Sequence, residues 1–267
     1  MNEQYRDTCL IGDVHGCYEE LQELMASIQF GKANLRVVFV GDYIDRGPKS
    51  IECVRYIRDL CEKGLAEALL GNHERKHFRY RAHEINKALS GKDNPMKPMS
   101  PNDSEFHKKL SDADIAWMRS LPLSLHLRDE WYAIHGGLEP AYDFDHQAPD
   151  QIIRCRYVSN GQHTTSSGKV IPYGRAVPLG KDMSQPANTM YWADIWNGTQ
   201  SFVYGHAVHS LYTPLITKRP NDVMCVGIDT GCVFGGHLTA FFLESGEFIK
   251  VKAKRAYASL VAGMGEE

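Results

Sequence analysis

The sequence of 267 residues lacks a membrane segment, a disulfide pattern and a cysteine metal motif. No stretch approaches the ~20 apolar residues that a spanning helix needs, and the polar residues 1–7 show no secretion signal. The seven cysteines are odd in number and have no CxxC spacing, which argues against a disulfide framework and against a zinc knuckle. We therefore expect a cytoplasmic protein in a reducing environment.

The chain also lacks a strong excess of either charge. It has 30 basic and 33 acidic residues, so its net charge is −3 before histidine is counted. This argues against a broad electrostatic surface for nucleic acid or anionic membranes, but it leaves a local basic groove open. With 43% hydrophobic residues the chain can bury a large core, and we expect one domain over residues 1–267.

Three short apolar runs near the start have the length of strands, and each ends in a glycine followed by polar residues. They cover residues 8–11, 36–40 and 66–70. Two amphipathic segments between them, at residues 18–28 and 50–62, predict helices. Strands that alternate with helices favour a parallel sheet, whose ligands collect outside the carboxyl ends of the strands.

Two long polar regions interrupt the later strands. Residues 76–114 predict an insertion with helical parts, and residues 159–200, rich in Gly, Ser, Thr, Pro and Asn, predict long loops over the active face. The hairpin spacing of the last two expected strands indicates a mixed sheet. Around these regions we expect a helix at 115–121 and strands at 123–127, 131–134, 201–204, 223–228, 238–243 and 247–251.

Polar side chains of three kinds follow the predicted strands. They are Asp13, His15, Asp42, Asn72, His73, His135 and His206. Carboxylate, imidazole and amide groups gathered at one sheet edge suit a pair of divalent ions, and one carboxylate can bridge them. Any single motif could be a turn with polar caps. Five motifs in order favour a shared metal site over five independent turns.

The motifs form a recognisable series. They are Gly-Asp-Val-His-Gly at 12–16, Gly-Asp-Tyr-Ile-Asp-Arg-Gly at 41–47, Gly-Asn-His-Glu at 71–74, His-Gly-Gly at 135–137 and Gly-His at 205–206. The series resembles the signature of the phosphoprotein-phosphatase branch of the calcineurin-like metallophosphoesterases over nearly the whole chain. The motif with Asp45 and Arg46 is the most specific to that branch. The resemblance implies an α/β fold, a mixed β-sandwich flanked by helices in a single domain.

The same resemblance implies two metal ions with Asp42 as the bridge. Asp13 and His15 would complete the first set of ligands, and Asn72, His135 and His206 would complete the second. Such a pair, ~3.5–4 Å apart, can hold a hydroxide at neutral pH and clamp phosphoryl oxygens without a covalent phosphoenzyme. Manganese is the expected metal, and iron, zinc, nickel or cobalt would also suit these donors.

Catalytic and substrate-binding roles follow from the resemblance as well. His73 would be the general acid for the leaving group, and Asp45 would orient it and raise its pKa. Arg46 would grip the non-bridging phosphate oxygens. Arg154 or Arg156 is the candidate for a second phosphate-binding arginine.

Other reactive residue types receive no chemical role from the sequence. Cys17 is expected to be a small buried side chain rather than a nucleophile. His209, close behind His206, stays undecided. Surface or capping positions are expected for His77, His83, His107, His126, His146 and His163.

The substrate is the least determined feature. The tail at residues 228–240 is similar to bacterial and phage members, among them diadenosine-tetraphosphate hydrolases, whereas residues 135–140 resemble the protein-phosphatase form. We therefore expect a phosphohydrolase of nucleoside polyphosphates or of phosphoproteins. The alternatives are a nucleic-acid end phosphatase or nuclease, against which the net charge weighs, and a metal-binding pseudoenzyme that serves as an interaction module. The oligomeric state is left open.

Overall fold

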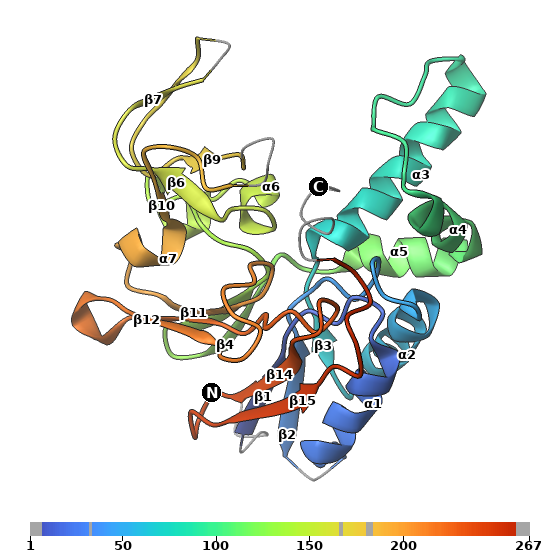
Figure 1. Ribbon diagram of the computed structural model, residues 1–267, viewed down its shortest axis with the longest axis horizontal. Coiled ribbons are helices and arrows are strands. Elements are labelled where there is room, and N and C mark those ends of the chain that lie inside the picture. The colour runs from blue at the N-terminus through green and yellow to red at the C-terminus, as the bar shows by residue number, and fades with distance from the viewer. Residues whose placement is uncertain (1–6, 32–33, 166–167, 180–183, 260–267) are drawn as a thin grey trace.

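Two five-stranded mixed sheets face each other in the computed structural model, which describes residues 7–31, 34–165, 168–179 and 184–259 (Figure 1). Helices cover the outer face of the first sheet, and a smaller β region lies on the other side of the molecule. The predicted α/β fold, a mixed β-sandwich flanked by helices, is confirmed. None of the helices in the described part of the chain has the length and apolar composition that crossing a bilayer requires.

The first sheet has the order β15-β14-β1-β2-β3. Its three N-terminal strands are parallel, and β14 and β15 add an antiparallel pair at one side. The strands and their connecting helices are β1 (Asp7–Ile11), α1 (Tyr18–Ser27), β2 (Leu35–Phe39), α2 (Ser50–Glu62), β3 (Glu67–Ala68), β14 (His237–Phe242) and β15 (Phe248–Lys252). The strand and helix alternation expected for this part of the chain is therefore present.

The second sheet has the order β12-β13-β11-β5-β4. Its strand β11 runs parallel to both β5 and β13. Edge strand β12 was not predicted, because alternate residues of its Leu-Ile-Thr-Lys sequence are exposed and it contains no apolar run. The bounds are β4 (Ser124–Arg128), β5 (Trp131–Ile134), β11 (Ser201–Tyr204), β12 (Leu215–Lys218) and β13 (Met224–Gly227).

The core follows from the two-residue period of the strands. Leu10 and Val38 pack with Val203 and Val226 between the two sheets. Their neighbours Cys9, Ile11, Val37 and Phe39 face the helices instead. Since successive side chains of a strand point to opposite faces, β1 and β2 are buried on both sides and read as continuous apolar runs.

The two polar regions have more regular structure than their sequences indicate. Three helices, α3 (Asn72–Ser90), α4 (Pro101–Lys109) and α5 (Asp112–Ser120), occupy the first. The described parts of the second contain short strands and a helix rather than loops alone. Within it lie β7 (His163–Thr164), β8 (Val170–Ile171), β9 (Ala176–Val177), β10 (Thr189–Tyr191) and α7 (Trp192–Ile195), while α6 (Pro149–Ile152) precedes it and β6 (Tyr157–Ser159) ends at its first residue. Two 3-10 turns complete the description, at Phe144–His146 and Pro220–Asp222.

Candidate metal centre and active site

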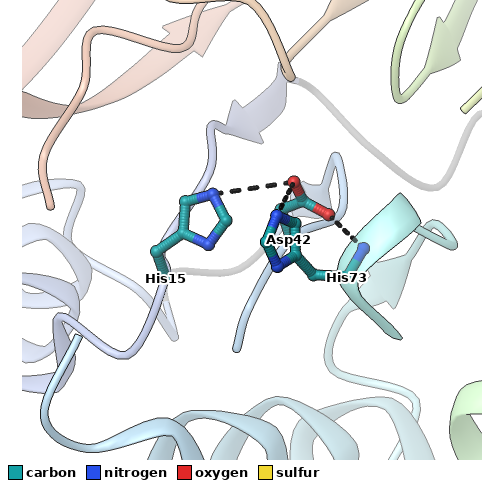
Figure 2. A group of neighbouring side chains, drawn as sticks. All are labelled: His15, Asp42 and His73. Atoms are coloured by element: carbon teal, nitrogen blue, oxygen red, sulfur yellow. Dashed lines mark hydrogen bonds and ion pairs between the residues drawn. The ribbon is translucent and has the colours of Figure 1, made fainter. Parts of the chain in front are cut away.

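The side chains predicted to bind metal converge at the carboxyl ends of strands from both sheets. Asp42, in the loop after β2, lies in the middle. Its carboxylate is 3.3 Å from His135 Nε2, 3.6 Å from His15 Nε2 and 3.9 Å from His73 Nε2. Figure 2 shows the rings of His15 and His73 turned toward this carboxylate. Residues 93 positions apart on the chain, Asp42 and His135, are thus in direct contact.

Two groups of potential ligands share Asp42. One contains His15, Asp42 and His73, and the other contains Asp42, His135 and His206, with the donor atoms of each group within 4.8 Å of one another. All five residues are buried. One carboxylate between two sets of imidazoles is the arrangement that two cations with a common bridging ligand require.

The remaining two predicted ligands lie beside these groups. Asn72 Oδ1 is 3.1 Å from His135 Nε2. Both carboxylate oxygens of Asp13 accept from the backbone N–H of His206, at 3.1 and 3.0 Å. Burial, and then the nearby charges of Asp229 and Asp42, raise the pKa of Asp13 well above its usual range. We call the seven residues at this place the strand-end cluster: Asp13, His15, Asp42, Asn72, His73, His135 and His206.

The hydrogen bonds behind two histidines suit metal binding. The Nδ1 atoms of His15 and His135 are 2.8 Å from Ile44 O and 2.9 Å from Val40 O. Because a carbonyl oxygen only accepts, each Nδ1 donates its proton to that carbonyl, and each Nε2 is the nitrogen left on the side of Asp42 for a cation. This fixed tautomer is the usual arrangement of metal-binding imidazoles. The donor set therefore fits a pair of divalent cations.

Several of these residues adopt the left-handed backbone region that favours glycine. The φ angles are 45° at His15, 55° at Asp42, 68° at Asp45, 66° at Arg46 and 68° at His206. Each such residue costs about 1–3 kcal/mol and persists only where its surroundings hold it in place. The loops after β1, β2 and β11 thus adopt unfavourable backbone angles that direct these side chains toward the site, and this lowers the stability of the fold.

Glu74, which the sequence analysis quoted only as part of a motif, fixes the Asp42 loop. Its carboxylate accepts from the backbone N–H groups of Gly71, Asp42 and Tyr43 at 3.1, 3.0 and 2.8 Å. The His73 N–H, in the first turn of α3, donates to Asp42 Oδ1 at 3.1 Å. The positive end of a 19-residue helix therefore faces the central carboxylate. Burial alone would raise the pKa of Asp42, but His135 and His73 hold it well below its usual range.

His73 and Asp45 form the expected pair. His73 Nδ1 lies 2.7 Å from Asp45 Oδ2, so this nitrogen donates and Nε2 is left toward the cluster. Nε2 is buried and has no hydrogen-bond partner among the described residues. The expected rise of the His73 pKa is absent, because burial and then Arg46 lower it more than Asp42 and Asp45 raise it.

Two histidines expected at the surface are buried behind Asp45, so that expectation was wrong. His77 is 0% exposed and His107 is 8% exposed. His77 Nε2 lies 2.7 Å from Asp45 Oδ1, and its Nδ1 lies 2.9 Å from His107 Nδ1. Lys76 Nζ also contacts Asp45 Oδ2, at 2.6 Å. The helical spacing of Lys76 and His77 after His73 was the available signal, but it required knowing that α3 begins at Asn72.

The hydrogen bonds of this histidine pair have one consistent direction. Arg81 Nε donates to His107 Nε2 at 3.4 Å, so His107 Nδ1 carries the proton toward His77 Nδ1, and His77 Nε2 donates to Asp45. Burial, and then the charges of His77 and Arg81, lower the pKa of His107 to about 4, which keeps it neutral near pH 7. Asp45 is therefore an acceptor for His73, Lys76 and His77 together.

The predicted arginines lie around the cluster. Arg46 Nη1 donates to His15 Nε2 at 2.6 Å, and its guanidinium stands over the Phe234 ring, 5.4 Å from the centroid. Arg156 Nη2 donates to the carbonyl of His206 at 3.2 Å. Arg154 and His73 line one common pocket. All three arginines are thus next to the cluster.

The sequence analysis assigned no role to Asp229, a buried acid whose charge acts on Asp13. Asp229 follows β13 just as Asp13 follows β1, and burial raises its pKa to about 6, while the charge of Arg46 opposes this. It is 7% exposed and accepts from Gly231 N at 2.9 Å. The strand-end pattern was the signal that could have found it.

The other residues considered earlier lie outside the chemistry. Cys17 is buried, as expected. His126 and His146 are exposed, and His83 and His163 are half-buried. The ring of His209 packs edge-on against Tyr191, with 4.3 Å between centroids.

Comparisons with known proteins agree with this geometry. The Calcineurin-like phosphoesterase family model matches residues 8–237. The chain is 30% identical over 260 residues to an asymmetrical bis(5'-nucleosyl)-tetraphosphatase of Bacillus subtilis, covering 93% of this chain and 95% of that protein. It is 35% identical over 297 residues to a symmetrical bis(5'-nucleosyl)-tetraphosphatase of Pasteurella multocida, covering 94% and 98%.

A solved structure provisionally assigned as a diadenosine tetraphosphatase has the same fold, with a TM-score of 0.67 and 21% identity over 94% of this chain and 95% of that chain. The family match spans every residue of the strand-end cluster. The chain therefore belongs to the calcineurin-like phosphoesterase family and is a phosphoric ester or anhydride hydrolase.

Proposed function

We propose that this chain is a dimetal phosphohydrolase that cleaves phosphoanhydride bonds in nucleoside polyphosphates of the diadenosine tetraphosphate type. The observation that carries the proposal is the sharing of Asp42 by two buried groups of ligands. The two relatives reported above, both named bis(5'-nucleosyl)-tetraphosphatases and matched over nearly their full length, support the substrate class.

The metals are part of the proposal. The strand-end cluster would hold two divalent cations, with manganese expected first and iron, zinc, nickel or cobalt as alternatives, because oxygen and imidazole donors suit all of them. When bound, the cations neutralise phosphoryl charge and supply a nucleophile at neutral pH. A cytoplasmic location also belongs here, supported by seven cysteines that are all free.

We assign to His73 the transfer of a proton to the leaving oxygen, which requires a protonated Nε2; burial and Arg46 lower the pKa of His73, and Asp42 and Asp45 oppose that lowering. Its Nδ1 is held by Asp45 at 2.7 Å, so its Nε2 is the nitrogen that faces the reacting phosphate. Proton donation by a positioned imidazole contributes about 10²–10⁴-fold to a rate. Arg46 is placed beside His15 to bind non-bridging phosphate oxygens, since a guanidinium offers two parallel donors.

A colorimetric assay tests the phosphohydrolase function. The purified protein, freed of metal by chelation, should hydrolyse p-nitrophenyl phosphate only after a divalent ion such as Mn²⁺ is added. Undiminished turnover in the chelated protein would falsify the mechanism, and inactivity with every metal would favour the pseudoenzyme.

The natural substrate class requires a second assay. Diadenosine tetraphosphate, a phosphoserine peptide and a 3'-phosphorylated RNA should be compared by kcat/KM under the same conditions. We expect the dinucleotide to be preferred. Chromatography of its products distinguishes cleavage into two nucleoside diphosphates from cleavage into a monophosphate and a triphosphate. Preference for the peptide would point to a phosphoprotein phosphatase instead.

A further inference from the structure

A pocket of about 560 Å³ opens directly beside His73 and Asn72. One wall comes from α3, and the other comes from residues 95–100, which lie in the polar region expected to be an insertion. Its lining includes Tyr80, Met96 and Met99, which we call the insertion wall. An aromatic ring and two thioether side chains form a surface suited to a flat organic ring.

Cationic side chains line the same pocket. Lys76 Nζ forms ion pairs with Asp45 at 2.6 Å and with Asp103 at 2.9 Å, so its charge is already balanced by two carboxylates of the protein. Arg79 and Arg154 also line the pocket. Planar guanidinium groups bind phosphate oxygens through paired hydrogen bonds.

A second pocket, of about 400 Å³, begins at these arginines. Arg79 and Arg154 line it as well, together with Arg156 and apolar residues such as Val177 and Leu179. The two pockets therefore meet at one pair of arginines. Residues of α3 line the first pocket and residues of α6 and β9 line the second, and these elements are labelled in Figure 1.

A third guanidinium group, that of Arg75, lies near the two arginines that the pockets share. Burial, and then the charges of Arg79 and Arg154, lower the pKa of Arg75. Arg75 itself is paired with Asp150. Arg75 is thus close enough to Arg79 and Arg154 to be repelled by both, and a chain of phosphates lying on the latter two would offset that repulsion.

We propose that the two pockets bind the two ends of a dinucleoside polyphosphate, and that Arg79 and Arg154 hold the phosphate chain between them. The insertion wall receives the nucleoside of the leaving group, because His73, the proton donor, lines that pocket. Both volumes lie in the usual range for small-molecule sites, roughly 300–1,000 Å³. This inference rests on the proposed phosphohydrolase function and assigns the residues that select its substrate.

The test compares a two-ended substrate with a minimal one. For each variant, kcat/KM is measured with Mn²⁺ on diadenosine tetraphosphate and on p-nitrophenyl phosphate. In Tyr80→Ala we expect the ratio of the first value to the second to fall about tenfold, within the range for loss of a base stacked on an aromatic side chain. Met96→Ala should lower the ratio by a smaller factor, and Tyr80→Phe should restore it.

Two controls separate binding from indirect effects. Leu89→Ala, on the same helix but with its side chain 83% exposed, should leave the ratio unchanged. Because the Tyr80 ring packs edge-on against His107 at 5.4 Å, an effect transmitted through His107 and Asp45 would lower both activities equally. Such an equal loss would overturn the inference.

Failure of the inference and failure of the underlying function give different results. An enzyme that prefers the dinucleotide but keeps the same ratio in Tyr80→Ala would overturn the two-pocket proposal alone. Inactivity on both substrates with every metal would overturn the proposed function and the inference together.

Discussion

The strand-end cluster and the insertion wall lie side by side but are built in opposite ways. In the cluster, Asp42 and His135 are 1% and 0% exposed and are held by backbone groups from several elements. In the wall, Tyr80 stands on α3, but Met96 and Met99 are half-buried on a segment without regular structure. The surrounding backbone therefore fixes the position of the cluster residues, whereas no helix or strand holds the two methionines of the wall. This difference is expected where chemistry is fixed and substrate choice varies.

The largest expected effect is at the bridging carboxylate. Asp42→Asn keeps the shape but removes the charge between the two groups of histidines, so kcat/KM should fall more than about 1,000-fold, as several kcal/mol of charge stabilisation are lost. Bound metal, measured by atomic emission after gel filtration, should fall as well. Asp59→Asn, at an exposed pair with Lys63, is the matched control. Retention of both metals and activity would show that the cluster is not the centre.

The next effect separates the roles of His73. In His73→Asn we expect kcat to fall about 100-fold or more while metal content is kept. The loss should be larger for phenyl phosphate than for p-nitrophenyl phosphate, because the poorer leaving group needs the proton more. An equal loss on both substrates together with lost metal would identify His73 as a ligand, as its place beside His15 and Asp42 also permits.

A smaller effect is expected behind the cluster. His77→Leu fills the same space but removes the 2.7 Å hydrogen bond to Asp45, so kcat should fall about tenfold, the lower end for residues that orient a ligand or catalytic group. Metal content and KM should stay near the values of the unchanged protein. His83→Leu, at a half-buried position on the same helix, serves as the control. Full activity in His77→Leu would show that this histidine does not contribute to catalysis through Asp45.

The smallest effect concerns stability against pH. The folded-state pKa of His107 is about 4, below the ordinary value of 6.5, and the side chains of His77, Arg81 and Tyr80 face it. Between these two pH values His107 binds a proton in the unfolded chain but not in the folded chain. The contribution of His107 to the free energy of unfolding is therefore fully present above pH 6.5 and is lost as the pH falls toward 4. Tm measured by scanning calorimetry should therefore fall less steeply over this window in His107→Gln. Parallel curves for the two proteins would contradict the assignment.

Much of the centre could be predicted because its signals are local. A strand that is buried on both faces reads as an apolar run, and the glycine and polar residues that end it follow directly on the chain. Asp13, Asp42 and Asn72 were found in this way. The same rule applied after β13 would have found Asp229. Strand β12 was not predicted because a half-exposed edge strand has no continuous apolar run.

By itself, the sequence determined the α/β alternation, the strand ends and the residue types that meet there, since these depend on neighbours within a few positions. Tertiary structure alone decided that His77 and His107 are buried behind Asp45, that Arg156 reaches His206, and that two pockets meet at Arg79 and Arg154. The physical reason is distance along the chain. Arg156 and His206 are 50 positions apart, and no local pattern encodes such a contact until the sheets and helices have packed.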